Sequence, residues 1–282
     1  MRFRPPLTPA TATGLTRRRV GAPARPHSPG LRWAWAGALC GALLSAVLGA
    51  PARWLADAVQ QISHDQVQLL LPRGTVWNGS AQLVLTGGSG SQDRSTLPGR
   101  LQWQLQPSLR GLGLALSLPC CTEPALQIQL SPNWGGATVQ VQDHHSHWPA
   151  ALLNGLGTPF NTLQVQGRLE LASQGLQLQW IAGRTHLDGQ LQIEARDVSS
   201  RLSTLKPMGS YRVTLQGGDS PTLQLNTLEG SLLLEGQGQW VGSRLRFEGA
   251  AQAAPEHEAA LDNLLNIIGR RRGARSIITL GS

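Results

Sequence analysis

The chain has 282 residues, with 24 basic and 16 acidic side chains and a formal net charge of +8. The first 32 residues hold seven arginines and no acid, whereas from Arg53 onwards 17 basic residues nearly balance the 16 acidic ones. A near-neutral body whose only lysine is Lys206 is a poor electrostatic trap for phosphate backbones, so the charge excludes nucleic-acid binding as the main function.

The N-terminal segment, residues 1–53, predicts a membrane topology. Residues 1–30 are rich in proline and arginine without apolar periodicity, and we expect a disordered basic cytoplasmic tail. Residues 31–53 follow as a predicted transmembrane anchor, because no charged side chain occurs from Trp33 to Ala52 and about 20 apolar residues span a bilayer as a helix. The arginine bias predicts a cytoplasmic N-terminus and an exported body.

A cleaved signal peptide is the alternative for the apolar segment, since Ala50-Pro51-Ala52 has the small residues of a cleavage site. The apolar run is long for a signal, which favours a retained anchor. Residues 52–63 then extend as a short helix leaving the membrane. Either alternative places residues 54–282 outside the cytoplasm, as a periplasmic β domain.

The body alternates apolar residues with glutamine, a pattern that predicts strands with one apolar and one polar face. The clearest runs are residues 101–105, 126–130, 139–141, 163–165, 176–180, 191–193 and 223–225. Glycine-containing breaks at 8–12-residue spacing are typical of antiparallel meanders. Within residues 76–79, Asn78-Gly79 predicts a tight hairpin turn, with Trp77 covering part of the apolar face.

Helical periodicity occurs in two places in the body. Residues 148–156 predict a short internal helix that opens on Pro149. Residues 256–272 predict a C-terminal helix whose final arginines, at 270–272, complement the helix dipole, and residues 276–280 predict a last strand. The fold class is therefore all-β: a long antiparallel meander forming a curved, partly open sheet, with these two helices and a preceding transmembrane helix. Its apolar face must be covered by the domain or stay open as a groove.

Reactive chemistry is sparse. Three imidazoles and a carboxylate in residues 143–147 have metal-ligand character, but their crowding in one predicted loop favours a solvated turn over a zinc site. The adjacent Cys120 and Cys121 are interpreted as two small apolar residues beside Pro119, with a redox switch as the alternative. The glycines of residues 111–113 and 236–238 belong to strands and open no phosphate loop. We expect no catalytic, metal or cofactor site, no cofactor, and no enzyme activity.

Three segments carry a family resemblance. They are Leu-Pro-Arg-Gly-Thr-Val-Trp-Asn-Gly-Ser-Ala at 71–81, Gly-Ser-Leu-Leu-Leu-Glu-Gly-Gln-Gly-Gln-Trp and the following strand at 230–248, and the stretch from Leu264 to Ile278. Together they resemble protein N of the bacterial type II secretion system. The chain is similar, more distantly, to the periplasmic repeat of AsmA-type proteins, which implies a curved sheet with an apolar concave side.

The resemblance implies a non-catalytic protein of the cell inner membrane. It would be single-pass, with its C-terminal domain in the periplasm, and would support assembly of the secretion system or export of folded proteins across the outer membrane. Its expected partners are other inner-membrane and periplasmic subunits of that system. The alternative function is AsmA-like handling of a lipid or another hydrophobe in the periplasm.

The predicted anchor carries small residues four apart, which suits contact between helices in a bilayer. They are Gly37, Gly41, Ser45 and Gly49. General tolerance of small residues in membrane spans explains the pattern equally well. If the stripe mediates self-association, replacing Gly41 and Ser45 by leucine weakens the signal in a membrane two-hybrid assay, and an unchanged signal rejects this interface.

Overall fold

The computed structural model describes residues 30–109, 111–181, 183–242 and 244–281. Their contacts divide the chain into two compact units, residues 1–45 and residues 46–282. The first unit contributes most of helix α1 (Gly30–Leu48), in which the side chains of residues 33–48 are all exposed. The predicted tail at residues 1–30 lies almost wholly outside the described residues.

The predicted anchor does not form one continuous helix. Helix α1 ends at Leu48, and a separate helix α2 (Ala52–Ile62) follows Pro51, which has an extended backbone. Proline lacks an amide proton and disfavours helical geometry in the residue before it, so the helix cannot run unbroken to residue 53. Within the described ranges, no helix reaches the length and apolarity required of a membrane span.

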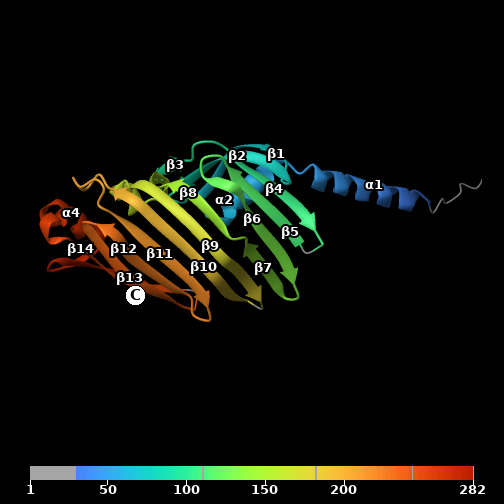
Figure 1. Ribbon diagram of the computed structural model, residues 1–282. Helices are drawn as coiled ribbons and strands as arrows, with labels where there is room; N and C mark the ends of the chain where they lie inside the picture. The colour runs from blue at the N-terminus through green and yellow to red at the C-terminus, as the bar shows by residue number, and fades with distance from the viewer. Residues whose placement is uncertain (1–29, 110, 182, 243, 282) are drawn as a thin grey trace, which may run out of the picture. The chain divides into compact units, whose positions relative to one another are not determined.

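The second unit is built on one antiparallel sheet (Figure 1). Its strands are β1 (Val67–Gly74), β2 (Asn78–Thr86), β3 (Arg94–Thr96), β4 (Leu101–Ser108), β5 (Gly111–Leu118), β6 (Thr122–Asn133), β7 (Gly136–Val141), β8 (His144–Pro149), β9 (Gln166–Ile181), β10 (Arg184–Ser199), β11 (Gly209–Gly218), β12 (Thr222–Gly230), β13 (Leu232–Val241), β14 (Arg244–Ala253), β15 (Arg270–Arg272) and β16 (Arg275–Leu280).

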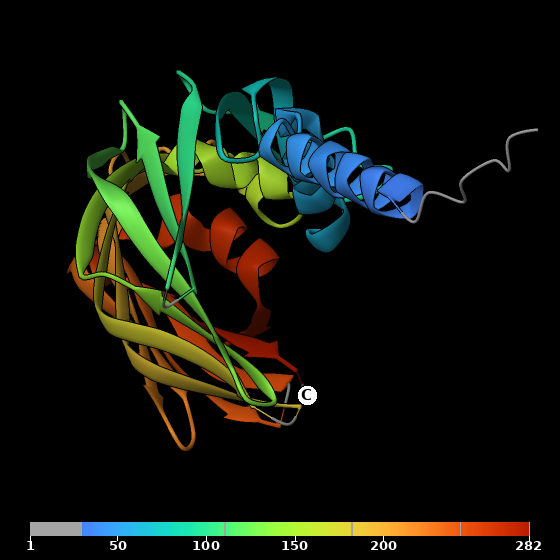
Figure 2. The same cartoon turned by 90° about the vertical axis from the view of Figure 1, so that its right-hand side faces the viewer.

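The strand order follows the chain almost throughout. It runs β1-β2-β4-β5-β6-β7-β9-β10-β11-β12-β13-β14-β16-β15, with β3 beside β2 and β8 beside β9. Figure 2 shows that this sheet curves, with helices on its inner side. The prediction of a mostly β fold, made of one large, open antiparallel sheet with few helices, is confirmed.

The register keeps apolar side chains on one face across many strands. Leu130 pairs with Val139, Val139 with Leu178, and Leu178 with Leu187. The glutamines between them point to the other face because side chains alternate along a strand. On β13, Gly236 and Gly238 continue this face without side chains, and the ring of Phe247 occupies the space that they leave. The glycines of residues 236–238 are thus strand residues, as predicted.

Helices cover the apolar face at its two ends. Near the C-terminus, α4 (Glu258–Ile268) buries Leu261, Leu264 and Leu265 against a cluster that includes Tyr211. Burial raises the pKa of the Tyr211 hydroxyl, which donates a hydrogen bond to the carbonyl of Leu232 at 3.1 Å.

Near the N-terminus, α2 packs Ala52 and Ala56 against Trp103. The short helix η1 (Ala150–Leu156) adds Leu152 to a neighbouring cluster that contains Leu97 and Leu118, and α3 (Phe160–Leu163) follows it. Both ends of the sheet therefore have a core of their own.

Both predicted body helices are shorter than expected. The segment 148–156 begins as the end of β8, and only from Ala150 does it turn into the 3₁₀ helix η1. The segment 256–272 forms a 3₁₀ turn η2 (Pro255–His257), then α4, and its arginines form strand β15 instead of the helix end. Gly269 has an extended backbone, so the helix stops there and the chain pairs with β16, which confirms the predicted last strand.

The first hairpin is present, but its turn lies earlier than predicted. Asn78 and Gly79 begin β2, Gly79 pairs with Gly74, and Thr75–Trp77 make the connection. Gly74 supplies the positive φ that the turn needs, at 87°.

The indole that fills this end of the core is not the predicted one. Trp77 donates its indole N–H to the carbonyl of Val47 at 2.8 Å and remains half-buried. Trp103 is only 3% exposed and donates its own indole N–H to the carbonyl of Val76 at 3.0 Å. The interpretation of Trp77 as the cover of the apolar face was therefore wrong.

The covering role of α4 predicts a position-dependent loss of stability. Leu261 is fully buried, so Leu261→Ala in the 46–282 body should lower the free energy of unfolding by about 2–5 kcal/mol in urea titrations. Ile267, on the same helix, is 45% exposed, and Ile267→Ala should change it by less than about 1 kcal/mol. Equal losses at both positions would show that α4 does not pack on the sheet through Leu261.

Candidate interaction surface

The histidine-rich segment does not gather into a metal site. His144, His145 and His147 lie on β8, where successive side chains point to opposite faces: His144 is buried, whereas His145 and His147 are exposed. Burial, and then the nearby charge of His145, lowers the pKa of His144. Asp143 accepts a hydrogen bond from the amide of Gly175 at 2.7 Å, turned to a backbone partner. The segment is a strand and not the predicted solvated turn.

Among the described residues, no group of three or more histidine, cysteine or acidic side chains is placed to hold a metal ion. The imidazole Nε2 of His186 lies 3.1 Å from the carboxylate Oδ1 of Asp188, and both side chains are more than 40% exposed. His64 and Asp65 follow α2, and hydrogen bonds from Ser89 and Gln60 lower the pKa of Asp65. The Ser89 hydroxyl donates to the Asp65 carboxylate at 2.5 Å, and its hydrogen bond, like that of Gln60, stabilises the ionised carboxylate.

Cys120 and Cys121 are joined by a disulfide in the turn between β5 and β6. The interpretation of two free thiols acting as small apolar residues was therefore wrong. Cys121 is nevertheless buried in the cluster with Leu118, as a small apolar residue would be. Residues adjacent in sequence carry no spacing signal for a disulfide, which is why the sequence favoured the other reading.

The two edges of the sheet are poor places for adding a strand. On β1, Pro72 lacks an amide proton, Leu71 has a positive φ of 50°, and the register shifts between Leu70 and Arg73. At the other edge, β15 has three residues, all of them arginine. Short, charged or irregular edge strands resist pairing with another chain. A partner is therefore better accommodated on a face of the sheet or at its turns.

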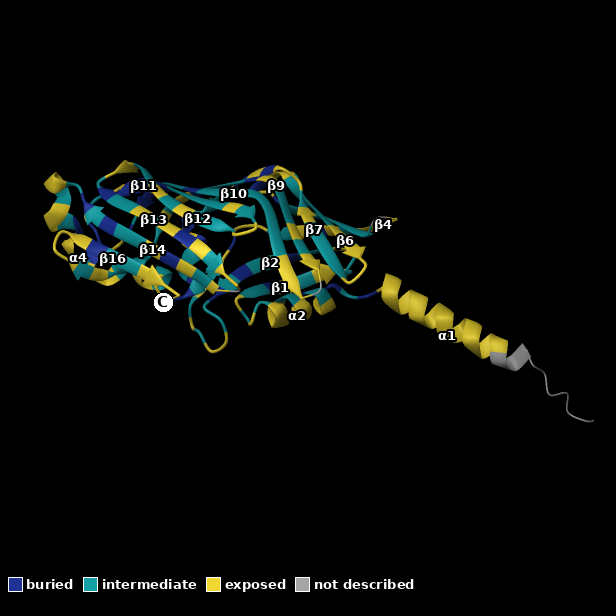
Figure 3. Cartoon of the chain, turned by 90° about the horizontal axis from the view of Figure 1, so that it is seen from below, coloured by how far each residue is buried: buried dark blue, intermediate teal, exposed yellow. Residues whose placement is uncertain are grey.

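The part of the apolar face that the helices do not cover remains exposed. Leu130 on β6 is 39% exposed, and Figure 3 shows further exposed positions on the strands near the C-terminus. Leu178 and Trp180 on β9 are 40% and 60% exposed, and Leu280 on β16 is 57% exposed. Leu178 and Trp180 belong to the alternating run 176–180, so sequence analysis placed them on the correct face, whereas the face of Leu280 follows from its pairing with Phe247. Sequence analysis did not predict that helices would cover only part of that face.

Large apolar residues also occupy turns, a feature that sequence analysis missed. Leu109 and Trp134 are fully exposed beside the turns that follow β4 and β6. The available signal was a leucine or tryptophan next to a turn glycine, where a polar residue is usual. Exposed apolar groups at such positions mark candidate contact points.

The polar face carries an ion-pair network across β9, β10 and β11. Glu194 is buried and accepts hydrogen bonds from Arg196, from Arg212 at 2.8 Å and from Gln192 at 2.8 Å. Arg196 also approaches Glu170 at 3.8 Å. Burial alone would raise the pKa of Glu194, but the hydrogen bonds and charges of Arg212 and Arg196 outweigh it, and the pKa lies below its usual value.

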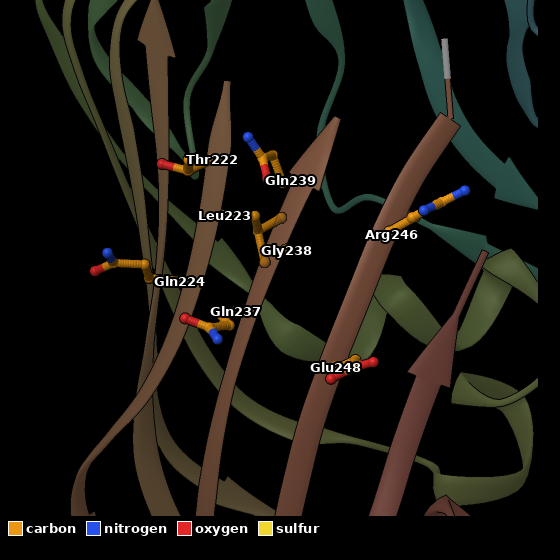
Figure 4. Close-up of a pocket in the computed structure, with 8 residues that line it drawn as sticks. All are labelled: Thr222, Leu223, Gln224, Gln237, Gly238, Gln239, Arg246 and Glu248. Atoms are coloured by element: carbon orange, nitrogen blue, oxygen red, sulfur yellow. The ribbon is translucent and has the colours of Figure 1, made fainter. Parts of the chain in front are cut away.

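A shallow polar hollow of about 370 Å³ lies further along this face, on β12, β13 and β14 (Figure 4). Glutamines dominate its lining: Gln224, Gln237 and Gln239 surround it, with Arg246 and Glu248 on β14. These groups offer neutral hydrogen bonding and one charge of each sign. Such a lining suits recognition of a polar group by hydrogen bonds.

One family model matches the chain. It is described as type II secretion system (T2SS), protein N, and it covers residues 65–278, from the start of the sheet into its last strand. The three segments that carry the sequence resemblance all lie within this range. No curated protein and no solved structure matches the chain.

The Glu194 network predicts a pH-dependent contribution to stability. A folded-state pKa below the unfolded value contributes stability above about pH 4.5 that is lost as the pH falls through the folded pKa. Glu194→Gln should therefore lower the free energy of unfolding by about 1–3 kcal/mol at pH 7, and the difference from wild type should shrink towards pH 3.

The matched control is Asp197→Asn, which removes the charge of an exposed pair with Arg168 and should cost less than about 1 kcal/mol at any pH. Denaturant titrations of both variants between pH 3 and pH 8 make the comparison. A Glu194→Gln deficit that does not change with pH would contradict the assignment of the ionised carboxylate as the stabilising group.

Proposed function

Since the chain belongs to the type II secretion system protein N family, we propose that it is a non-catalytic, inner-membrane-anchored component of that system. In this role it supports assembly of the machine or export of folded proteins across the outer membrane. The observation that carries the proposal is the family match over residues 65–278, which includes nearly the whole sheet.

The proposed topology is a single span within the predicted segment 31–53, formed by its part up to Leu48, where α1 ends, with the N-terminus in the cytoplasm and the β domain in the periplasm. The seven arginines ahead of residue 33 and the uncharged segment from Trp33 to Ala52 support it. Anchoring holds the domain near other membrane subunits and raises its effective concentration towards them. The proposed partners are the inner-membrane and periplasmic subunits of the system.

Binding, and not chemistry, is the activity that the domain supports best. Its stability is supplied by the covered ends of the sheet, where α4 and α2 pack. Its turns and its open apolar half present groups that a folded domain ordinarily buries. A partner subunit or an exported protein that covers these groups would remove apolar area from water at about 25 cal/mol per Å².

A second candidate function is the handling of a lipid or another hydrophobe, and the open half of the apolar face favours it. An acyl chain lying against Leu178, Trp180 and their neighbours would gain roughly 0.8 kcal/mol for each buried CH₂ group. The two functions differ in what is lost from the cell when the protein is absent.

Deletion of the gene tests both. We expect enzymes that the system normally secretes to accumulate in the periplasm and to return to the medium when the full chain is supplied in trans. Normal secretion combined with altered outer-membrane permeability or lipid composition would instead support hydrophobe handling and overturn the secretion role.

A matched complementation tests the anchor. Residues 46–282 are exported to the periplasm behind a cleavable signal and compared with the full chain at equal abundance. If the anchor acts by raising effective concentration, the detached body should restore secretion only weakly or at high expression. Full restoration at equal abundance would show that residues 1–45, and with them most of the proposed anchor, are dispensable for the role.

A further inference from the structure

Six connections between strands lie along one edge of the sheet: those between β1 and β2, β4 and β5, β6 and β7, β9 and β10, β11 and β12, and β13 and β14. Four of them carry a large exposed apolar residue in or beside the turn: those between β4 and β5, β6 and β7, β9 and β10, and β13 and β14. The register places them together, because Leu112 pairs with Leu130 and Leu178 pairs with Leu187, each one or a few residues from its turn. In Figure 1 these turns point to the lower right, away from α4, η1 and α3, which lie at the opposite edge.

Each of the four turns presents a large apolar side chain to solvent. Leu109 and Trp134 are fully exposed, Trp180 is 60% exposed and Val241 is 52% exposed. Gly135, Gly183 and Gly242 have positive φ angles in these turns, which keeps the connections tight. The apolar residues therefore stand at the outermost points of the sheet.

The same four turns are basic in sequence. Segments 108–111, 133–136, 180–184 and 241–244 contain three arginines, at positions 110, 184 and 244, and no acidic residue. Arg184 and Arg244 are exposed. The β11–β12 turn, which lies between the β9–β10 and β13–β14 turns, adds one exposed acidic residue, Asp219, so the edge keeps an excess of basic over acidic groups.

We propose that this edge, defined by Leu109, Trp134, Trp180, Val241, Arg184 and Arg244, docks on the surface of an anionic phospholipid bilayer. Tryptophan favours the headgroup zone because its indole has an apolar body and a polar N–H. Arginines near an anionic surface add electrostatic attraction.

The spacing of the groups favours a lipid surface over a protein. The apolar side chains stand singly on separate turns and do not form one contiguous patch with a central pocket, which protein interfaces usually have. A bilayer accepts such isolated insertions without a matching shape. Docking would also turn the open half of the apolar face, where Leu178 lies just behind the turns, towards the membrane.

The test uses the 46–282 body, because its three buried clusters contain no residue before Ala50 and the described side chains of α1 are exposed. It is mixed with vesicles of phosphatidylcholine alone or with 30–40% phosphatidylglycerol (about one lipid in three) at low salt, and bound protein is measured by sedimentation. We expect preferential binding to the anionic vesicles and a blue shift of tryptophan emission.

Two pairs of substitutions separate the contributions. Trp134→Ser with Trp180→Ser should reduce the affinity about tenfold or more, because both indoles leave the interface. Arg184→Gln with Arg244→Gln should reduce it roughly fivefold for each arginine and remove most of the preference for anionic lipid. Trp134 is fully exposed, so its replacement should leave the unfolding midpoint unchanged, which thermal melts verify.

Matched controls lie away from this edge. Ile62, at the end of α2, is 81% exposed, and Arg201 is exposed in the connection between β10 and β11. Ile62→Ser and Arg201→Gln should leave vesicle binding unchanged.

Three results would overturn the proposal: no binding to anionic vesicles, equal losses in the controls, or turn variants that abolish self-association in sedimentation velocity without affecting vesicle binding. The last result would assign the edge to contact between copies of the chain. None of these results depends on secretion, so the test is independent of the proposed cellular role.

Discussion

Alternation of side chains along paired strands is the constraint on which the rest of the structure depends. Because the strand order follows the chain, a one-residue slip in any hairpin would carry its leucines to the glutamine face. The pairing of Leu130, Val139, Leu178 and Leu187 shows that the register holds across β6, β7, β9 and β10. The cost of this regularity is a single extended apolar face, which a sheet without a second layer must cover by other means.

The chain covers that face only in part. At the C-terminal end, α4 covers the face with Leu261, Leu264 and Leu265. At the N-terminal end, α2 and η1 cover it with Ala52, Ala56 and Leu152. The strands extend beyond these helices, so Leu178, Trp180 and Leu280 stay exposed. The buried clusters that stabilise the fold and the exposed apolar residues thus lie in different parts of the same sheet. A substitution in the exposed part need not disturb the buried clusters.

Much of the sheet could be predicted from the sequence because period-two alternation and turn glycines are local signals, which recur in β4, β6, β7, β9, β10 and β12. The alternating run at residues 163–165 was wrongly predicted as a strand, since Leu163 ends α3 and β9 begins only at Gln166. Features that depend on contacts between residues far apart in the sequence could not be predicted. Arg270–Arg272 complement a helix end by composition, yet pairing with β16 draws them into a strand. Trp77 and Trp103 both fit the apolar series, and only the packing of α2 decides that Trp103 is the buried one. The exposed Trp134 resembles core tryptophans until its turn is placed in space.

For the candidate surface, too, some features could be predicted from neighbouring residues, and others depend on contacts between distant parts of the chain. The position of Leu178 and Trp180 on the apolar face could be predicted from the alternation, whereas their exposure depends on where the helices stop. The polar face adds a rigid element: Glu194, held by Arg196 and Arg212, ties β10 to β11 at the middle of the sheet. A sheet fixed there can present its turns as a row of defined spacing. A component that works by contact needs that rigidity, because a flexible surface would lose more conformational entropy on binding for every residue that it orders.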